Sequence, residues 1–243
     1  MRLSLLIILM LPLYLFAQRR DKEERIVYFT DDQVKRSSVF LAADGSGIYS
    51  NRSVLGQRGA GFAPGAIEQI PRSRATFAYH YGGYFGVRLS RSLEVSFGVS
   101  QNNAGWLNRR TEYEGISTQT RVRLNQTNLP VHFSFFSKMN DFLILEVVPM
   151  LELNMLTSYT EDISMRREPF SDLVKLDMVD EARQFNISVG IAIGGRFMLT
   201  DQFSFYARPF FRYMVNPILE TDDRPREVVW GVGLMTGLRF DFL

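Results

Sequence analysis

The chain contains no cysteine: none of its 243 residues is one. This absence excludes disulfide bonds, thiolate metal sites and a cysteine nucleophile, so the folded chain must be held together without covalent cross-links. The formal net charge of +2 is too small to indicate binding to nucleic acid. The glycines of the chain precede no strand-to-helix turn, so they do not form a phosphate-binding fingerprint. We therefore expect neither a nucleic-acid partner nor a cofactor.

Long apolar runs are also missing beyond the N-terminus. No later segment approaches the ~20 consecutive apolar residues that a membrane helix needs. The N-terminal run from Leu5 to Phe16 is too short for such a helix, but it follows Arg2 and ends at a small-residue cleavage site before Gln18. The sequence therefore predicts a secretory signal peptide over residues 1–17.

The chain has instead a strict alternation of apolar and polar residues. From Phe185 to Leu199 the odd positions are mainly large and apolar, while the even positions are small or polar. Segments 74–89 and 228–242 repeat this pattern. A water-soluble sheet also alternates, because one of its faces packs on a core. Repeated at membrane-spanning length behind a secretory signal, the pattern predicts apolar residues facing lipid and polar residues facing a lumen.

Eight such segments are present, and their connections alternate in length. Short turns occur at 90–92, 137–141 and 200–202, whereas long connections lie between them. The sequence therefore predicts an all-β fold, an eight-stranded antiparallel transmembrane β-barrel of the outer-membrane type. The predicted strands span residues 38–49, 74–89, 93–107, 119–136, 142–158, 184–199, 203–215 and 228–242.

The alternating connections also predict an orientation. Outer-membrane barrels keep short turns on the periplasmic side and long loops outside, and an even strand number places both termini in the periplasm. We assign residues 18–36, which are rich in charge, to a periplasmic arm and residues 37–243 to the barrel. The expected location is the outer membrane of a Gram-negative bacterium, and outer-membrane lipid and lipopolysaccharide are expected contacts.

Charged residues at lumenal positions predict an ion-pair core. An eight-stranded barrel is just wide enough for side chains to fill its interior. Opposite charges there should pair, because an unpaired buried charge is costly. This arrangement argues against a conduction path. Besides Asp44, the predicted lumenal charges are Arg88, Glu94, Glu146, Glu152, Arg196, Arg208, Arg212, Arg239 and Asp241.

The two histidines raise a catalytic alternative. His80 and His132 fall on lumenal positions of non-adjacent strands, with Glu146 and Glu152 nearby in the predicted barrel. Two histidines with carboxylates suit a metal site or a base–orienter pair for hydrolysis. A group that acts on lipid must open toward lipid or the loop rim, however, and these positions lie in the middle of the barrel. We therefore expect no catalytic residue and no bound metal.

The long connections carry the candidate contact surface, because function concentrates in loops on a rigid scaffold. One loop holds an apolar run from Gly59 to Ile67, and another mixes charged and apolar residues between Tyr159 and Arg183. Apolar residues among charges in a long loop suggest a surface that meets a partner. The equally weighted alternative is a lid of loops that fold over one another. The candidate contact residues are Phe62, Ile67, Ile70, Arg166, Arg167 and Phe170.

The signal ending at Leu15-Phe16-Ala17-Gln18, the segment Asn128 to Phe133, the eight strands and the aromatic C-terminus carry a family resemblance. In these features the chain resembles the PorT-like outer-membrane barrels and, more broadly, the small OmpA/OmpX-type barrels. The final residue, Leu243, departs from the usual terminal aromatic residue, and Phe242 takes the outward position instead. The resemblance implies an accessory role in protein export or assembly at the outer membrane.

Three functions compete on this evidence. The leading hypothesis is a non-enzymatic subunit of an outer-membrane protein complex, which contacts outer-membrane or periplasmic proteins through its loops or its arm. The second is a barrel enzyme that modifies lipid or cleaves peptide bonds. The third is a diffusion pore, which the small barrel and its predicted ion-pair core disfavour.

Overall fold

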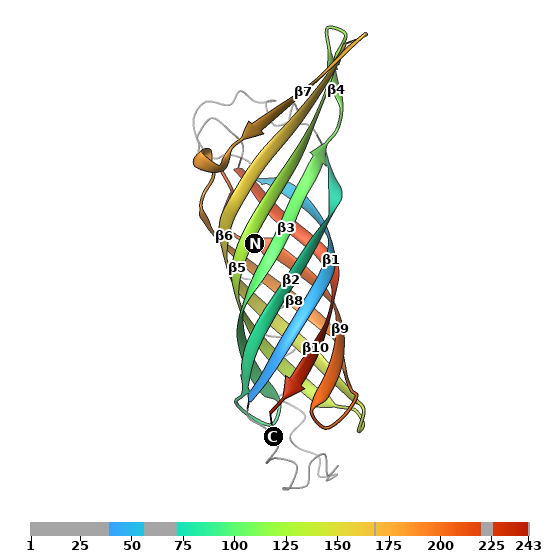
Figure 1. Ribbon diagram of the computed structural model, residues 1–243, viewed down its shortest axis with the longest axis vertical. Coiled ribbons are helices and arrows are strands. Elements are labelled where there is room, and N and C mark those ends of the chain that lie inside the picture. The colour runs from blue at the N-terminus through green and yellow to red at the C-terminus, as the bar shows by residue number, and fades with distance from the viewer. Residues whose placement is uncertain (1–38, 56–71, 168, 220–225, 243) are drawn as a thin grey trace. The chain divides into compact units, whose positions relative to one another are not determined.

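Eight antiparallel strands close into a ring in the computed structural model, which describes residues 39–55, 72–167, 169–219 and 226–242 (Figure 1). Around the ring the order is β1, β2, β3, β5, β6, β8, β9 and β10, and β10 pairs back with β1. Closure removes the sheet edges, so main-chain groups find partners within the wall, as a membrane requires. This ring confirms the predicted fold class.

The ring strands begin close to the predicted positions, but several of them are longer. They are β1 (Val39–Leu55), β2 (Ser73–Arg88), β3 (Leu93–Asn108), β5 (Ile116–Lys138), β6 (Leu143–Arg167), β8 (Phe185–Met198), β9 (Phe203–Met214) and β10 (Arg226–Asp241). The shortest, β9, has 12 residues. At ~3.3 Å per residue and a tilt of ~40°, such a strand spans ~30 Å, which matches the hydrocarbon thickness of a bilayer.

The outside of the ring is an apolar belt. Successive strand residues point to opposite faces, so the predicted register places one apolar row of each strand outward. The structure has this register: His80 and Arg239 lie buried inside, while Tyr79 and Leu238, their chain neighbours, are exposed outside. Exposed outward residues of the belt include Leu41, Phe85, Phe97, Val99, Phe133, Leu145, Leu151, Ile187, Ile193, Phe211, Leu234 and Leu238.

The short turns lie at one end of the ring, here called the turn end. At 139–142 the side chain of Asn140 accepts hydrogen bonds from the backbone amides of Phe142 and Leu143, at 3.1 and 2.8 Å. Thr200 does the same for the last turn, accepting from the Phe203 amide at 2.9 Å. These side chains satisfy turn amides that have no ladder partner.

The two described ends of the barrel also meet at the turn end, where the Phe242 amide donates to the Val39 carbonyl at 3.1 Å. Both lie at the same end of the ring as the short turns (Figure 1). Which side of the membrane this is remains a prediction from the alternation of turns and loops.

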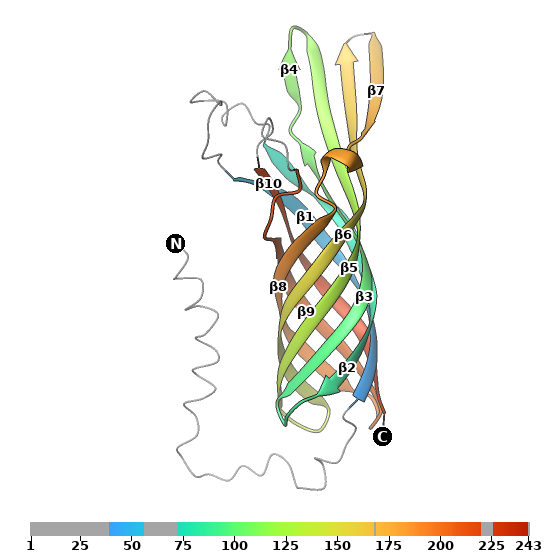
Figure 2. The ribbon, with the colours of Figure 1, turned by 90° about the vertical axis from the view of Figure 1, so that its left-hand side faces the viewer.

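The far end differs from the prediction, because two segments expected to be loops are strands. β4 (Thr111–Tyr113) pairs with the first residues of β5, and β7 (Phe170–Asp177) pairs with the last third of β6. Together with the outer parts of β5 and β6 they form a four-stranded antiparallel sheet. Figure 2 shows this protruding sheet standing beyond the ring. We use the name for residues 111–120, 160–167 and 169–177.

Several expectations concern residues outside the described ranges: the signal peptide, the arm at 18–36, and the contact residues Phe62, Ile67 and Ile70. What was predicted for these residues stays a prediction. No helix among the described residues is long and apolar enough to cross a membrane.

Candidate functional site

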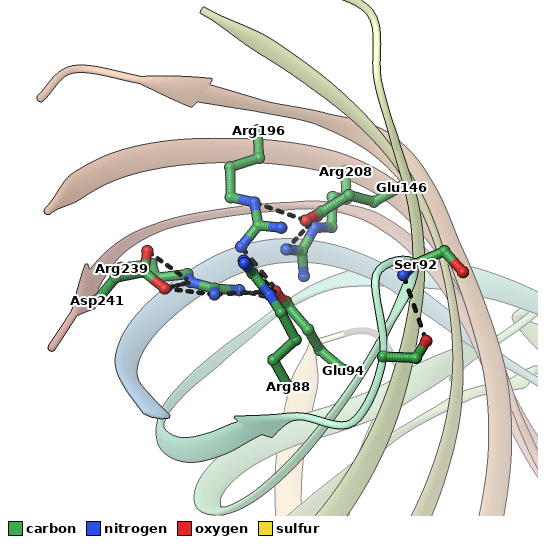
Figure 3. Close-up of polar contacts among 9 residues, drawn as sticks. Arg88, Ser92, Glu94, Glu146, Arg196, Arg208, Arg239 and Asp241 are labelled. Carbon is green, nitrogen blue, oxygen red and sulfur yellow. Dashed lines mark hydrogen bonds and ion pairs between the residues drawn. The ribbon is translucent and has the colours of Figure 1, made fainter. Parts of the chain in front are cut away.

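Glu94 is the centre of an ion-pair network near the turn end of the lumen (Figure 3). It is the second residue of β3, and its carboxylate is fully buried. Arg88 reaches it from β2 at 3.0 Å, and Arg239 reaches both of its oxygens from β10, one at 3.0 Å. Arg196 of β8, on the opposite wall, lies 3.4 Å from the second oxygen of Glu94. One carboxylate therefore joins three strands besides its own.

Two further carboxylates complete this network. Arg196 Nε lies 2.8 Å from Glu146 Oε1 on the neighbouring strand β6, and Arg208 of β9 pairs with the other oxygen of Glu146. Asp241 accepts from Arg239 Nε at 3.1 Å. Four arginines and three carboxylates thus occupy one layer. Glu146 makes ion pairs there, whereas Glu94 and Asp241 accept charge-assisted hydrogen bonds, which are stronger than neutral ones.

Aromatic rings support the same guanidinium groups. The Arg239 guanidinium carbon lies 3.5 Å from the centre of the Phe40 ring, and Arg208 lies 4.0 Å from that of Tyr206. Both arrangements are cation–π contacts, which compensate part of the lost hydration of a buried cation. The network therefore fills the lumen with charged groups that have partners on several sides.

Asp44 forms the next layer toward the far end of the lumen. Tyr84 and Tyr206 donate to its two oxygens at 3.2 and 3.1 Å. His80 Nε2 lies 3.5 Å from Asp44 and 3.1 Å from the Tyr84 hydroxyl. The His132 ring packs against Tyr84, with ring centres 4.9 Å apart. Sequence analysis did not single out the two tyrosines, although their even positions in β2 and β9 already place them inside.

The carboxylates that were expected beside the histidines have other partners. Glu146 pairs with two arginines, and Glu152 accepts from Arg212 at 3.0 Å. The carboxylate in contact with His80 is instead Asp44. Within the described residues no group of three or more histidines and carboxylates is arranged to hold a metal ion.

The lumenal charges balance. Arg88, Arg196, Arg208, Arg212 and Arg239 supply five positive charges, and Asp44, Glu94, Glu146, Glu152 and Asp241 supply five negative ones. With neutral histidines the described lumen therefore carries no net charge in these layers. An electrically balanced, paired interior suits a structural core, because it leaves no charge without compensation.

Above the charged layers the lumen changes from charged to neutral groups. Buried amides and hydroxyls lie there, some of them paired, such as Asn154 with Ser188 at 2.6 Å and Asn102 with Gln126 at 3.2 Å. The layer consists of Ser50, Asn102, Gln126, Asn128, Asn154, Asn186 and Ser188.

An apolar cluster caps the far end of this lumen. Trp106 is fully buried there, and Arg52, which pairs with Glu227, lies over its ring at 5.5 Å. The short helix η3 (Val179–Glu181) and an isolated bridge from Ala182 to Leu219 bring connecting segments into the cluster. Its members are Ala104, Trp106, Val122, Leu124, Leu156, Tyr159, Met178, Ala182, Met214, Ile218, Leu219 and Val229.

The protruding sheet has two unlike faces. Residues directly opposite in the ladder share a face, and Thr120, Ile163 and Val174 are opposite one another. This face, which is the more apolar of the two, also carries Glu161, Arg167 and Asp172; its other members are Thr111, Tyr113, Ile116, Thr118, Met165, Phe170 and Leu176. The opposite, polar face carries the exposed Leu173 among Glu112, Ser117, Gln119, Thr160, Asp162, Ser164, Arg166, Ser171, Lys175 and Asp177.

The three contact residues that the structure describes lie at the tip of this sheet. Phe170 is 72% exposed and lies opposite Arg167 on the apolar face, while Arg166 lies on the polar face. They come together as neighbours in the hairpin of β6 and β7. Tyr113, at the tip of the other hairpin, is equally exposed but was not predicted as a contact residue.

Comparison with known proteins supplies no family for the chain. No family model matches it, and no curated protein does. The PorT-like resemblance therefore stays a prediction.

Solved structures of similar fold are outer-membrane proteins. Neisserial surface protein A is 14% identical over 85% of this chain and 98% of its own, with a TM-score of 0.41. The outer membrane protein OprG from Pseudomonas aeruginosa is 12% identical over 85% and 97%, with a TM-score of 0.40. The outer membrane protease OmpT from Escherichia coli is 8% identical over 86% and 98%, with a TM-score of 0.41. At such values these likenesses say nothing about activity or partners, and the closed eight-stranded ring with its apolar belt is itself the outer-membrane barrel architecture.

Proposed function

We propose that this chain is a non-enzymatic outer-membrane barrel that serves as an accessory subunit of an outer-membrane protein complex. In this proposal the short turns face the periplasm and the protruding sheet stands outside the cell. The observation that carries the proposal is the contrast between a lumen filled by paired charges and a sheet whose apolar face has no cover among the described residues.

The lumen supports this proposal rather than an enzyme or a pore. His80 and His132 are 3% and 4% exposed. They lie between the charged network and the neutral layer, so neither lipid nor a peptide has a route to them through the described side chains. Among the described residues, the paired charges and the apolar cluster around Trp106 also stand in the way of a diffusing solute.

The protruding sheet supports a binding role. Soluble parts of a protein rarely expose a contiguous apolar surface, and such surfaces usually mark interaction sites. Phe170 and Tyr113 are each exposed by more than 70% at the tip. The resemblance to PorT-like barrels suggests a protein-export assembly as the setting.

Purification in a mild detergent tests the proposal. The full-length protein, extracted from its native membrane after brief chemical cross-linking, is expected to carry other outer-membrane or periplasmic proteins in fixed ratio. A monodisperse monomer under the same conditions, with and without cross-linker, would contradict it.

The enzyme hypothesis predicts a different result. Expression of the wild-type chain would change lipopolysaccharide or a cleaved substrate, and His80→Ala or His132→Ala would abolish that change. We expect no such change with any of the three proteins. An activity lost in either variant would overturn the non-enzymatic proposal.

A further inference from the structure

The two outer edges of the protruding sheet are unlike. β4 has three residues, whereas β7 has eight, and every residue of β7 is exposed. Between Phe170 and Asp177 there is no proline or glycine, and the ladder with β6 contains no bulge. Proteins normally protect such edges by shortening them, bending them or placing charges along them. β4 is protected by its shortness. β7 carries the charged residues Asp172, Lys175 and Asp177, but it is neither short nor bent by a bulge.

We propose that β7 is a strand-addition site, at which an extended segment of a different protein pairs with β7 as the fifth strand of the protruding sheet. This inference rests on the proposed function, and it specifies that the partner binds through an extended, strand-forming segment. Strand addition draws its affinity from main-chain hydrogen bonds and its specificity from alternate side chains. Eight residues of strand offer ~27 Å of backbone to such a segment.

The side chains of β7 define the chemistry of the segment. On the apolar face Phe170, Val174 and Leu176 continue the surface formed by Ile163 of β6, and Asp172 is the one charged residue that β7 places there. A segment with apolar residues at alternate positions would extend that surface and cover it at its border. On the polar face its other residues would lie beside Lys175 and Asp177.

A second copy of the chain fits this edge poorly. Two copies in one membrane are related by rotation about the membrane normal, so both protruding sheets point outward. Their β7 strands would then run in the same direction, and the apolar face of one sheet would continue into the polar face of the other. Lipopolysaccharide offers no backbone donors and acceptors in strand geometry. An extended segment of a different polypeptide can pair with the main chain of β7 and can also place apolar and polar side chains on the matching faces of the sheet.

Site-specific photo-cross-linking in the intact outer membrane tests the inference. A benzophenone amino acid is placed singly at Ser171, Leu173 and Lys175, which share one face of β7, with Glu112 of β4 and Gln119 of β5 as controls. We expect the three β7 probes to capture one segment of one protein. Probes two residues apart should map to sites two residues apart in that segment, and the controls should give at least ~10-fold less product.

The outcomes separate this inference from the proposed function. A partner that co-purifies but gives no β7 products, or products without the two-residue spacing, overturns strand addition and leaves the function standing. Products with a second copy of the chain, or with lipid alone, overturn it as well. If no partner co-purifies, the proposed function fails and the inference fails with it.

A matched pair of variants adds a quantitative test. Leu173→Lys combined with Val174→Lys places charges on both faces of the β7 edge, and Thr111→Lys combined with Glu112→Lys does the same on the β4 edge. We expect recovery of the partner to fall by at least ~10-fold for the β7 variant and to stay unchanged for the β4 variant. Heat-modifiable mobility in gels confirms that both barrels are folded. Equal recovery from the two variants would overturn the inference.

Discussion

At the scale of single residues, the lumen is organised by carboxylates that each serve several arginines. Glu94 receives Arg88, Arg196 and Arg239, and Glu146 receives Arg196 and Arg208. Arg196 and Arg239 reach Glu94 from strands that are not adjacent to β3, so these two contacts tie distant strands together. Removing one carboxylate would therefore leave several buried cations without compensation.

Glu94→Gln should destabilise the barrel strongly for this reason. Breaking a buried ion pair by removing one partner typically costs ~3–5 kcal/mol, and here three guanidinium groups lose the same anion. Urea unfolding in lipid vesicles, followed by the fluorescence of the two tryptophans, measures the loss.

Asp141→Asn is the matched control, because it removes a fully exposed carboxylate, which pairs with Lys138 at 2.8 Å. We expect no measurable change there, as for most surface ion pairs. If Glu94→Gln behaved like this control, Glu94 would not be the centre of the network.

Sequence alone predicted a lumenal position for ten charged residues, but it did not predict the buried Arg52 and Glu227 or which of the groups pair. Alternation fixes the face of each residue, so Glu94 and Arg239 were both expected inside. Their contact crosses the lumen from β3 to β10, and it depends on the stagger of strands around the whole ring. The same dependence explains why Asp44, and not Glu146 or Glu152, contacts His80. The partners of Asp44 are the hydroxyls of Tyr84 and Tyr206, which are uncharged, so a search of the sequence for opposite charges does not find them.

At the scale of elements, the ring strands differ from the strands of the protruding sheet in what surrounds their exposed apolar residues. On β8, Ile193 lies between other outward apolar residues, including Ile191 and Phe197, all facing the belt. On β7, Leu173 is exposed among polar residues. The first environment is lipid and the second is water in the proposed membrane position.

Arginine substitutions distinguish these two environments. Ile193→Arg should lower the free energy of unfolding by ~2–4 kcal/mol, the typical cost of arginine near the bilayer midplane. Leu173→Arg should have little effect on stability. Unfolding in vesicles of defined lipid measures both. A similar large loss for Leu173→Arg would place the protruding sheet in the membrane.

Gly83 and Gly98, which lie side by side on the adjacent strands β2 and β3, offer a test of how closely the strands of the wall pack. A Cβ atom at Gly98 would lie 2.3 Å from the Gly83 carbonyl oxygen and 2.5 Å from a ring carbon of Tyr84. At Gly83, which faces outward, a Cβ would meet nothing within 4 Å. The wall at this point therefore approaches itself too closely for any side chain on the inner face.

Gly98→Ala should accordingly destabilise the barrel by ~1–3 kcal/mol, the usual cost of overpacking. Gly83→Ala should be neutral or slightly stabilising, since alanine restricts the unfolded chain. Refolding yield and urea unfolding of the two single variants give the comparison. Equal effects would show that the close approach at Gly98 does not limit the wall.

The ring strands followed from sequence, whereas β4 and β7 did not. A membrane strand is recognised in the sequence by large apolar residues at every second position, as from Phe185 to Leu199. In the protruding sheet this contrast is weaker: threonines hold much of one face, and charges are frequent. A signal was present at Glu114-Gly115, both of which have positive φ, of 50° and 74°. Such a pair at the centre of a two-residue turn is typical of a tight hairpin.

At the scale of the whole molecule, the lumen is a stack of unlike layers. The charged network lies near the turn end, Asp44 with its tyrosines and histidines comes next, and neutral amides lie beneath the apolar cluster around Trp106. The apolar layer is unfavourable for ions, and the layer of paired charges is unfavourable for apolar solutes. Together the layers therefore exclude both kinds of solute. An eight-stranded barrel reaches this state with ordinary side chains, because its interior is only as wide as they are.

The filled lumen predicts that the reconstituted protein does not conduct. In planar bilayers with 1 M salt we expect no stable unitary steps, because ions would have to displace Trp106 at one end and the Glu94 network at the other. Insertion must be shown independently, by heat-modifiable mobility of protein recovered from the same vesicles. A Glu94→Gln barrel that still inserts should stay closed too, since the apolar cluster remains, and only loss of both barriers should admit ions. Reproducible steps from the wild-type protein would mean that these layers move aside, and the pore hypothesis would then replace the accessory one.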